Sequence, residues 1–177
     1  MALSTERDYS RSGLTIQQAM VDHVKRHPGR RSRPPYILWG GRHVQTSDLL
    51  EVPSEGIVRA EFIAASSEVR QGFDMKLDGW FQLAEGEQVP LLRTWKEDRF
   101  VDQVEYPFHS RDCRMIVWNV YEMSYPGGER VVEKWTENAG FWVDVCGEGE
   151  RVYHCSHGMA NPPDFSSLVF KVSVRPR

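Results

Sequence analysis

The sequence lacks any apolar run near the roughly 20 residues that a membrane-spanning helix needs. Polar residues also stand where a signal peptide would have its apolar stretch. A strong net charge is missing too, since 22 Lys and Arg against 25 Asp and Glu leave −3 at pH 7. No overall field would therefore attract nucleic acid or an acidic membrane. We expect a cytoplasmic protein with neither of these partners.

An even set of cysteines, as secreted domains of this size often carry, is also absent. The three present are Cys113, Cys146 and Cys155. If the last two flank a hairpin turn at 147–150, symmetric pairing places Cys155 opposite Trp142 and not opposite Cys146. We expect free thiols. At 177 residues and 40% hydrophobic content, the chain can bury one core without disulfides or metals.

One segment near the N-terminus has a clear helical pattern. Thr15 followed by Gln18 is a capping box, and Pro28 ends the pattern. The sequence predicts an amphipathic helix over 15–27, with apolar positions Ile16, Met20 and Val24.

A basic segment that ends in two prolines follows the helix. Its cations are Arg30, Arg31 and Arg33. The segment is either a solvated connector or a docking arm for an acidic partner. We therefore divide the chain into an N-terminal helix and basic linker (1–35) and a β-sandwich binding domain (36–177).

The rest of the chain has the pattern of short strands separated by Gly, Pro, Asp and Ser clusters. Their number and spacing favour an antiparallel sandwich or barrel. A tight hairpin turn is predicted over 39–42. The candidate strands are 36–39, 57–64, 72–77, 89–94, 99–104, 114–123, 130–135, 141–146, 151–155 and 168–174.

Two of these strands carry further information. Residues 168–174 alternate between apolar and polar side chains, which predicts one wet face. Residues 114–123 are apolar on both faces, so this strand should be central, with Trp118 in the core and Asn119 in need of a hydrogen-bond partner.

A β-hairpin with aromatic residues at its mouth is predicted where 130–135 and 141–146 flank a short Asn/Gly turn. Rings beside a polar tip suit the holding of a polymer chain, because they add stacking area at low entropic cost. Tryptophans in a sandwich are, however, often core residues. We expect Trp80, Trp135 and Trp142 to be divided between core edge and surface.

The segment that ends in Asp78-Gly79-Trp80, together with Lys134-Trp135-Thr136-Glu137-Asn138-Ala139-Gly140, resembles the paired signatures of family 21 starch-binding modules. Related bacterial sandwich domains of unknown function are similar as well. The resemblance implies an immunoglobulin-like β-sandwich without catalytic residues. Trp80, Trp135 and Asn138 fit the motifs of the family, whereas Thr136 and Glu137 stand in for its Asp and Asn. Trp142 and Val143 stand where the family has the Asn and Tyr that help to bind sugar.

Soft metal ligands cluster at His154, Cys155 and His157. A zinc site would need further ligands, and no second close pair is present, so we expect neither metal nor cofactor. Cys155 and His157 could also mimic a nucleophile and its base, but strand geometry aims neighbouring residues apart. An enzyme that uses this region remains a second alternative.

The sequence thus predicts an all-β, antiparallel, immunoglobulin-like sandwich with one short N-terminal helix. We expect a non-catalytic accessory module for an extended peptide or protein partner, such as the precursor peptide or an enzyme of a biosynthetic pathway. Glucan binding is the first alternative, and the oligomeric state stays open. The candidate ligand-binding residues are Trp80, Trp135, Glu137, Asn138, Trp142, Arg30, Arg31 and Arg33.

Overall fold

The computed structural model describes residues 6–27, 29, 36–98 and 102–177. Within these residues the elements are α1 (Ile16–Arg26), β1 (Ile37–Trp39), β2 (Arg42–Val44), β3 (Asp48–Glu51), β4 (Glu55–Ala65), β5 (Gln71–Gln82), the 3-10 turn η1 (Ala84–Gly86), β6 (Gln88–Trp95), β7 (Gln103–Ser124), β8 (Arg130–Glu133), β9 (Gly140–Gly147), β10 (Glu150–Ser156) and β11 (Leu168–Pro176). No helix among them is long and apolar enough to cross a bilayer.

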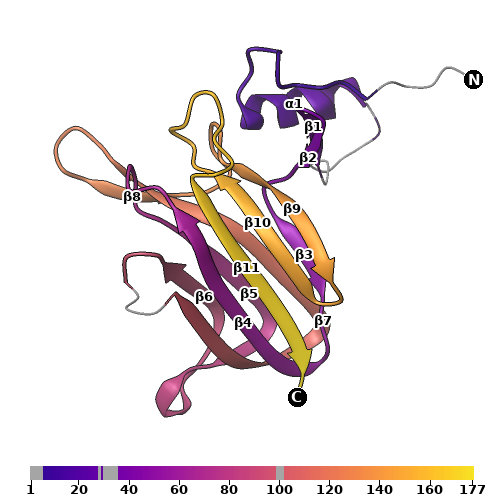
Figure 1. Ribbon diagram of the computed structural model, residues 1–177, viewed down its shortest axis with the longest axis vertical. Helices are drawn as coiled ribbons and strands as arrows, with labels where there is room; N and C mark the ends of the chain where they lie inside the picture. Colours follow the sequence, from indigo (N-terminus) through magenta and orange to yellow (C-terminus); the bar gives the residue numbers. More distant parts are fainter. Residues whose placement is uncertain (1–5, 28, 30–35, 99–101) are drawn as a thin grey trace, which may run out of the picture.

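Nine strands form one antiparallel sheet in the order β6-β5-β7-β4-β11-β10-β9, and β3 and β8 also pair with β7. The sheet folds over itself because β7 is 22 residues long and changes neighbours along its length. Its first part pairs with β4 and its second part with β3 and β8. Between these parts Cys113 has φ 56°, and the register with β5 shifts between Leu77 and Gly79. The bend lets one sheet supply both layers (Figure 1).

The core lies between these layers and is built on aromatic stacking. Phe73 of β5 stacks on Phe170 of β11 at 4.3 Å between ring centroids, and Phe170 stacks on Tyr153 of β10 at 4.7 Å. All three rings are fully buried. The antiparallel, sandwich-like all-β fold with one N-terminal helix is therefore confirmed.

A buried carboxylate also ties the layers together. Asp48 of β3 accepts hydrogen bonds from the Tyr153 hydroxyl at 2.9 Å and from Arg151 at 2.6 Å, both on β10. These two donors, one of which is a cation, offset the cost of removing this carboxylate from water. The Asp48 cluster thereby fixes the small strand β3 against the opposite layer.

The predicted helix is confirmed as Ile16–Arg26, with both hydrogen bonds of the Thr15–Gln18 capping box. It packs on the β1–β2 hairpin at one end of the sheet (Figure 1). This packing forms a second apolar cluster, apart from the main core, whose buried members are Tyr9, Ile16, Ala19, Met20, Ile37 and Val44.

The predicted pairing of 130–135 with 141–146 is wrong. β8 pairs with β7, whereas β9 pairs with β10. The turn that joins β7 to β8 is short, so closing this local hairpin costs little entropy. Trp135 and Glu137 then adopt positive φ values of 61° and 49°, and the chain turns away before β9 begins.

Other strand predictions differ from the observed strands in detail. β7 runs without interruption where two strands were expected over 99–104 and 114–123, although 99–101 lie outside the described residues. Cys155 lies opposite Phe141, and not opposite Trp142, because a bulge between Glu150 and Arg151 shifts the register. The three cysteines are free. The short strands β2 and β3 had too few residues to show an alternating pattern.

Several local predictions are confirmed. Trp39 pairs with Arg42 across the predicted tight turn. Trp118 is buried, and the Asn119 side chain donates to the Ser156 carbonyl at 3.0 Å. β11 has an apolar buried face and a wetter face that carries Lys171.

Candidate functional site

Three side chains from three strands stack at the end of the sandwich that carries α1. The Arg42 guanidinium lies 3.8 Å from the Trp142 ring centroid. On the other face of that indole, the His154 ring stacks at 3.7 Å with an interplanar angle of 3°. His154 Nε2 lies 3.2 Å from a carboxylate oxygen of Asp144. Both faces of Trp142 are therefore covered.

The β1–β2 turn that presents Arg42 is held from the N-terminal segment. Gly40 and Gly41 have φ values of 58° and 78°, which suit glycine in a two-residue hairpin turn. The Asp8 carboxylate accepts hydrogen bonds from both of their N–H groups and from that of Ser10. The N–H groups of Ser10 and then Gly40 lower the pKa of Asp8 to about 2, so it stays ionised at neutral pH.

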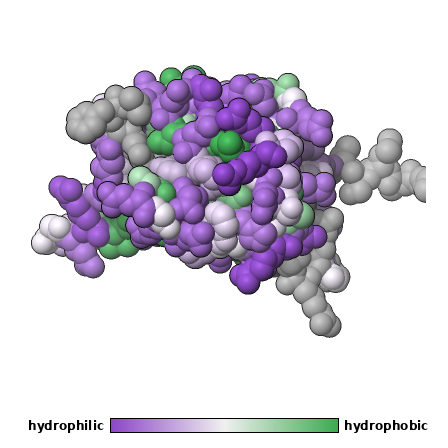
Figure 2. All heavy atoms as spheres, turned by 90° about the horizontal axis from the view of Figure 1, so that it is seen from below, coloured by the Kyte–Doolittle hydropathy of each residue, from purple (hydrophilic) through white to green (hydrophobic). Residues whose placement is uncertain are grey.

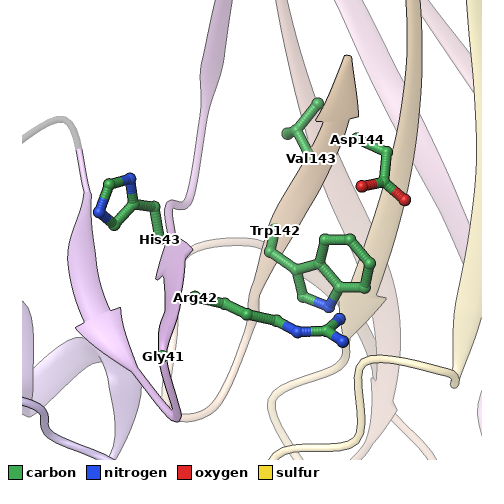
Figure 3. A pocket seen from close by; sticks show the side chains of 6 residues that line it. All are labelled: Gly41, Arg42, His43, Trp142, Val143 and Asp144. Carbon is green, nitrogen blue, oxygen red and sulfur yellow. The ribbon is translucent and has the colours of Figure 1, made fainter. Parts of the chain in front are cut away.

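β2 and β9 meet at one bridge and then separate. Gln45 and Phe141 exchange two backbone hydrogen bonds of 2.8 Å each. Beyond this bridge lies an open space of about 590 Å³ between the strands, shown in Figure 3. We call it the Arg42 hollow, and its lining residues are Gly41, Arg42, His43, Trp142, Val143 and Asp144.

One side of the hollow is the outer edge of β9. The N–H and C=O of Phe141 point outward to Gln45, and in a strand the same groups two and four residues later point the same way. These groups belong to Val143 and Val145, which no described strand pairs on that side. The Val145 side chain is 70% exposed. We call this row of backbone groups the β9 edge.

The β9 edge is more open to pairing than the strand at the other end of the sheet. β9 contains no proline, and Asp144 is its one charged residue. The strand at the other end of the sheet, β6, contains Pro90, which cannot donate to a ladder. Seen from the end opposite α1, the surface is mainly hydrophilic with small separate apolar patches (Figure 2). The β9 edge is therefore the best candidate for pairing with another chain.

The hollow is lined by one exposed cation, Arg42, and one exposed carboxylate, Asp144. Arg42 is exposed, and none of the ion pairs among the described residues includes it. Asp144 lies beside His154 instead. A guanidinium stacked on an indole keeps its N–H groups directed outward in the ring plane, where a carboxylate can accept two of them. The hollow can therefore receive a planar anion.

Of the predicted binding residues that the structure describes, Trp142 is the one that lines the hollow. Trp135 packs edge-on against Trp118 at 5.7 Å, with the Lys134 ammonium above it. Trp80 lies on β5 beside His109, 5.6 Å between ring centroids. Arg30, Arg31 and Arg33 lie outside the described residues.

The predicted residues at the tip of the loop hold the helix. The buried Asn138 side chain accepts from the Ile16 N–H at 3.2 Å and donates to the Ala160 carbonyl at 2.7 Å. Glu137 has an exposed side chain, and its backbone exchanges hydrogen bonds with Gln17. The loop therefore joins α1 to the sheet.

Arg42, His43 and Asp144 were not singled out from the sequence as site residues. Arg42 lies 100 positions from Trp142, so no local spacing could reveal their contact. The two-glycine turn before Arg42 was the available signal, since it forces a sharp reversal at that point.

The histidine and cysteine cluster has no nucleophile in a reactive setting. Burial raises the pKa of the Cys155 thiol well above its usual range, which keeps it protonated. His157 is buried, and its Nδ1 accepts the Met159 N–H at 3.2 Å. Within the described ranges, no group of three His, Cys, Asp or Glu side chains could hold a metal ion.

Comparison with protein-family models, curated proteins and solved structures finds no match to this chain.

Proposed function

We propose that this protein is a non-catalytic binding module that takes an extended peptide segment of a partner as an added strand on β9. The observation that carries the proposal is the β9 edge, whose outward N–H and C=O groups at Val143 and Val145 have no strand partner and which begins, at Val143, in the wall of the Arg42 hollow. Strand addition uses main-chain hydrogen bonds for affinity and alternate side chains for specificity.

The surroundings of the edge support this mode of binding. Trp142 is held between Arg42 and His154, so its ring offers a rigid wall that loses little rotamer freedom on binding. Val145 adds exposed apolar area that a partner strand would cover. The module would act in the cytoplasm, on the precursor peptide or an enzyme of a biosynthetic pathway.

The same geometry disfavours the glucan alternative. Stacking on a sugar needs an open ring face, and both faces of Trp142 are covered. Trp135 is held against Trp118, under Lys134. The enzyme alternative loses support from the protonated state of Cys155.

Selection from a library of random dodecapeptides, followed by titration of the strongest binder, tests the proposal. The substitution Val145→Pro removes one outward N–H of the edge and should weaken binding at least about tenfold, the effect of one or more lost hydrogen bonds. Val145→Thr keeps that N–H and a β-branched side chain, so it serves as the matched control.

Three outcomes would refute the proposal. The library could yield no binder, Val145→Pro could bind as well as the parent, or the Val145 amide could exchange equally fast with and without peptide. Sedimentation at increasing protein concentration separates a further case, in which the β9 edge pairs with a second copy of this chain and the peptide competes for it.

A further inference from the structure

The β9 edge has a fixed end. The backbone N–H of Phe141 already donates to the Gln45 carbonyl, and the Phe141 carbonyl accepts the Gln45 N–H, at 2.8 Å each. An added strand can therefore pair with Val143, Val145 and the residues beyond, but it must stop or turn away at the Gln45 bridge. The stopping point lies in the Arg42 hollow.

The direction of the added strand decides which end of the peptide arrives there. Every pairing in the main sheet is antiparallel, including that of β9 with β10. Antiparallel pairing is also slightly more stable per residue than parallel pairing. From its N-terminal end to its C-terminal end, β9 runs away from the bridge. An antiparallel strand on its edge therefore runs toward the bridge, so the carboxyl end of the peptide lies next to the bridge.

The charge at this end matches a carboxylate. Among the described residues that line the hollow, Arg42 is a cation that takes part in no ion pair with the described acidic side chains, whereas the carboxylate of the hollow, Asp144, lies 3.2 Å from His154 Nε2. Its guanidinium is fixed on the Trp142 ring, which reduces the entropy lost when it binds. A parallel strand would instead bring a positively charged amino terminus beside Arg42, which like-charge repulsion disfavours.

We propose that the Arg42 hollow binds the free C-terminal carboxylate of a peptide tail, with Arg42 as its cationic partner. This inference rests on the proposed strand addition to β9. It restricts the partner to a chain end, since an internal segment has an amide at the same place and would have to turn out past Gln45. The α-carboxylate accepts a bidentate pair of N–H groups from the guanidinium.

The experiment uses random heptapeptides displayed with free carboxyl ends. The strongest binder is then synthesised in two forms, as the free acid and as the C-terminal amide. The free acid should bind the parent protein at least about tenfold more tightly than the amide, as expected for a charge-assisted hydrogen-bonded pair. Arg42→Gln should remove this preference by weakening the acid alone. Arg42 is exposed, and dichroism verifies that the variant is folded.

Arg114→Gln is the matched control, because Arg114 is also an exposed strand arginine but lines a different hollow, on β7. It should keep the preference for the acid. Equal binding of acid and amide, or a preference that survives Arg42→Gln, would overturn the carboxylate site and leave strand addition standing. If neither form binds and the dodecapeptide library is also empty, the proposed function fails together with this inference.

Discussion

Asn138 and Ile16 are joined by a hydrogen bond across 122 positions of the chain: the Asn138 side-chain oxygen accepts the first helical N–H of α1 at 3.2 Å. Free N–H groups at a helix start need such partners. Asn138 also donates to Ala160, so one buried amide links α1, the loop before β9 and the loop after β10. The segment that resembles a sugar-binding tip therefore has a structural use in this chain.

The first prediction follows from that amide. Asn138→Ala leaves the Ile16 N–H and the Ala160 carbonyl without their partner and should lower the free energy of unfolding by about 2–3 kcal/mol. Chemical denaturation provides the measurement. Thr15→Ala, which removes only the cap of the same helix, should cost about 1 kcal/mol. An Asn138→Ala protein with parental stability and lost ligand binding would instead return Asn138 to the binding site.

The second prediction concerns Trp142. The side chain is half-buried, so Trp142→Ala should cost about 2 kcal/mol of stability, below the range of about 3–5 kcal/mol for a fully buried Trp. It should also weaken peptide binding by more than about 1 kcal/mol, because the wall of the Arg42 hollow is lost.

Trp80→Ala is the control for Trp142, since Trp80 is a half-buried tryptophan of β5 outside the hollow. It should reduce stability without any change in peptide affinity. Calorimetry of both proteins gives the stability and the affinity together. Unchanged affinity in Trp142→Ala would remove Trp142 from the site.

The third prediction is a loss of stability in mild acid that depends on His157. Burial lowers the pKa of His157 from its ordinary value of 6.5, and the Glu68 carboxylate, 3.7 Å from Nε2, opposes that shift. Below pH 6.5 the unfolded chain takes up a proton that the folded chain does not. The free energy of unfolding must therefore fall as the pH drops through 6.5 toward the folded pKa.

Denaturation curves between pH 8 and pH 5 measure this effect against His157→Gln, which removes the titrating group. The difference in stability between the two proteins should shift in favour of the variant as the pH falls. Glu68→Gln should steepen the loss in the parent background, because it removes the charge that stabilises the protonated imidazole. A pH-independent difference between parent and His157→Gln would contradict the prediction.

The fourth prediction separates peptide from glucan. β-Cyclodextrin should leave the tryptophan fluorescence unchanged, because both faces of Trp142 are occupied and Trp135 packs against Trp118. A saturable change at sub-millimolar sugar would restore the glucan alternative. In that event Trp142→Ala and Trp135→Ala would show which ring the sugar contacts.

Local signals in the sequence predicted much of the fold. The capping box, the two-glycine turn and the alternation of β11 each depend on residues close together in the chain, and each is present. The pairing of β8 could not be predicted this way, since β7 and β9 are both apolar strands within reach of it. Pattern alone does not decide between two partners of similar character.

The candidate site was harder still to predict from the sequence pattern than the strand pairing. Trp142 stood out because an aromatic residue beside a polar turn is a visible pattern. Its neighbour His154 comes from the paired strand β10, and Arg42 comes from the separate β1–β2 hairpin, which meets β9 at the Gln45–Phe141 bridge, so only the tertiary fold brings the three together. A solitary arginine after a glycine turn has no signature of its own in the sequence.

The length of β7 has a consequence for how the molecule opens. Because β7 pairs with β3, β4, β5 and β8, breaking its ladder deprives four strands of a neighbour at once. Because both layers contain part of β7, one layer cannot separate from the other while each keeps its own strand pairing. Amide protons at the middle of β7 should therefore exchange with solvent only when the whole sheet is lost, whereas the outward amide protons of the β9 edge should exchange freely while the sheet stays folded.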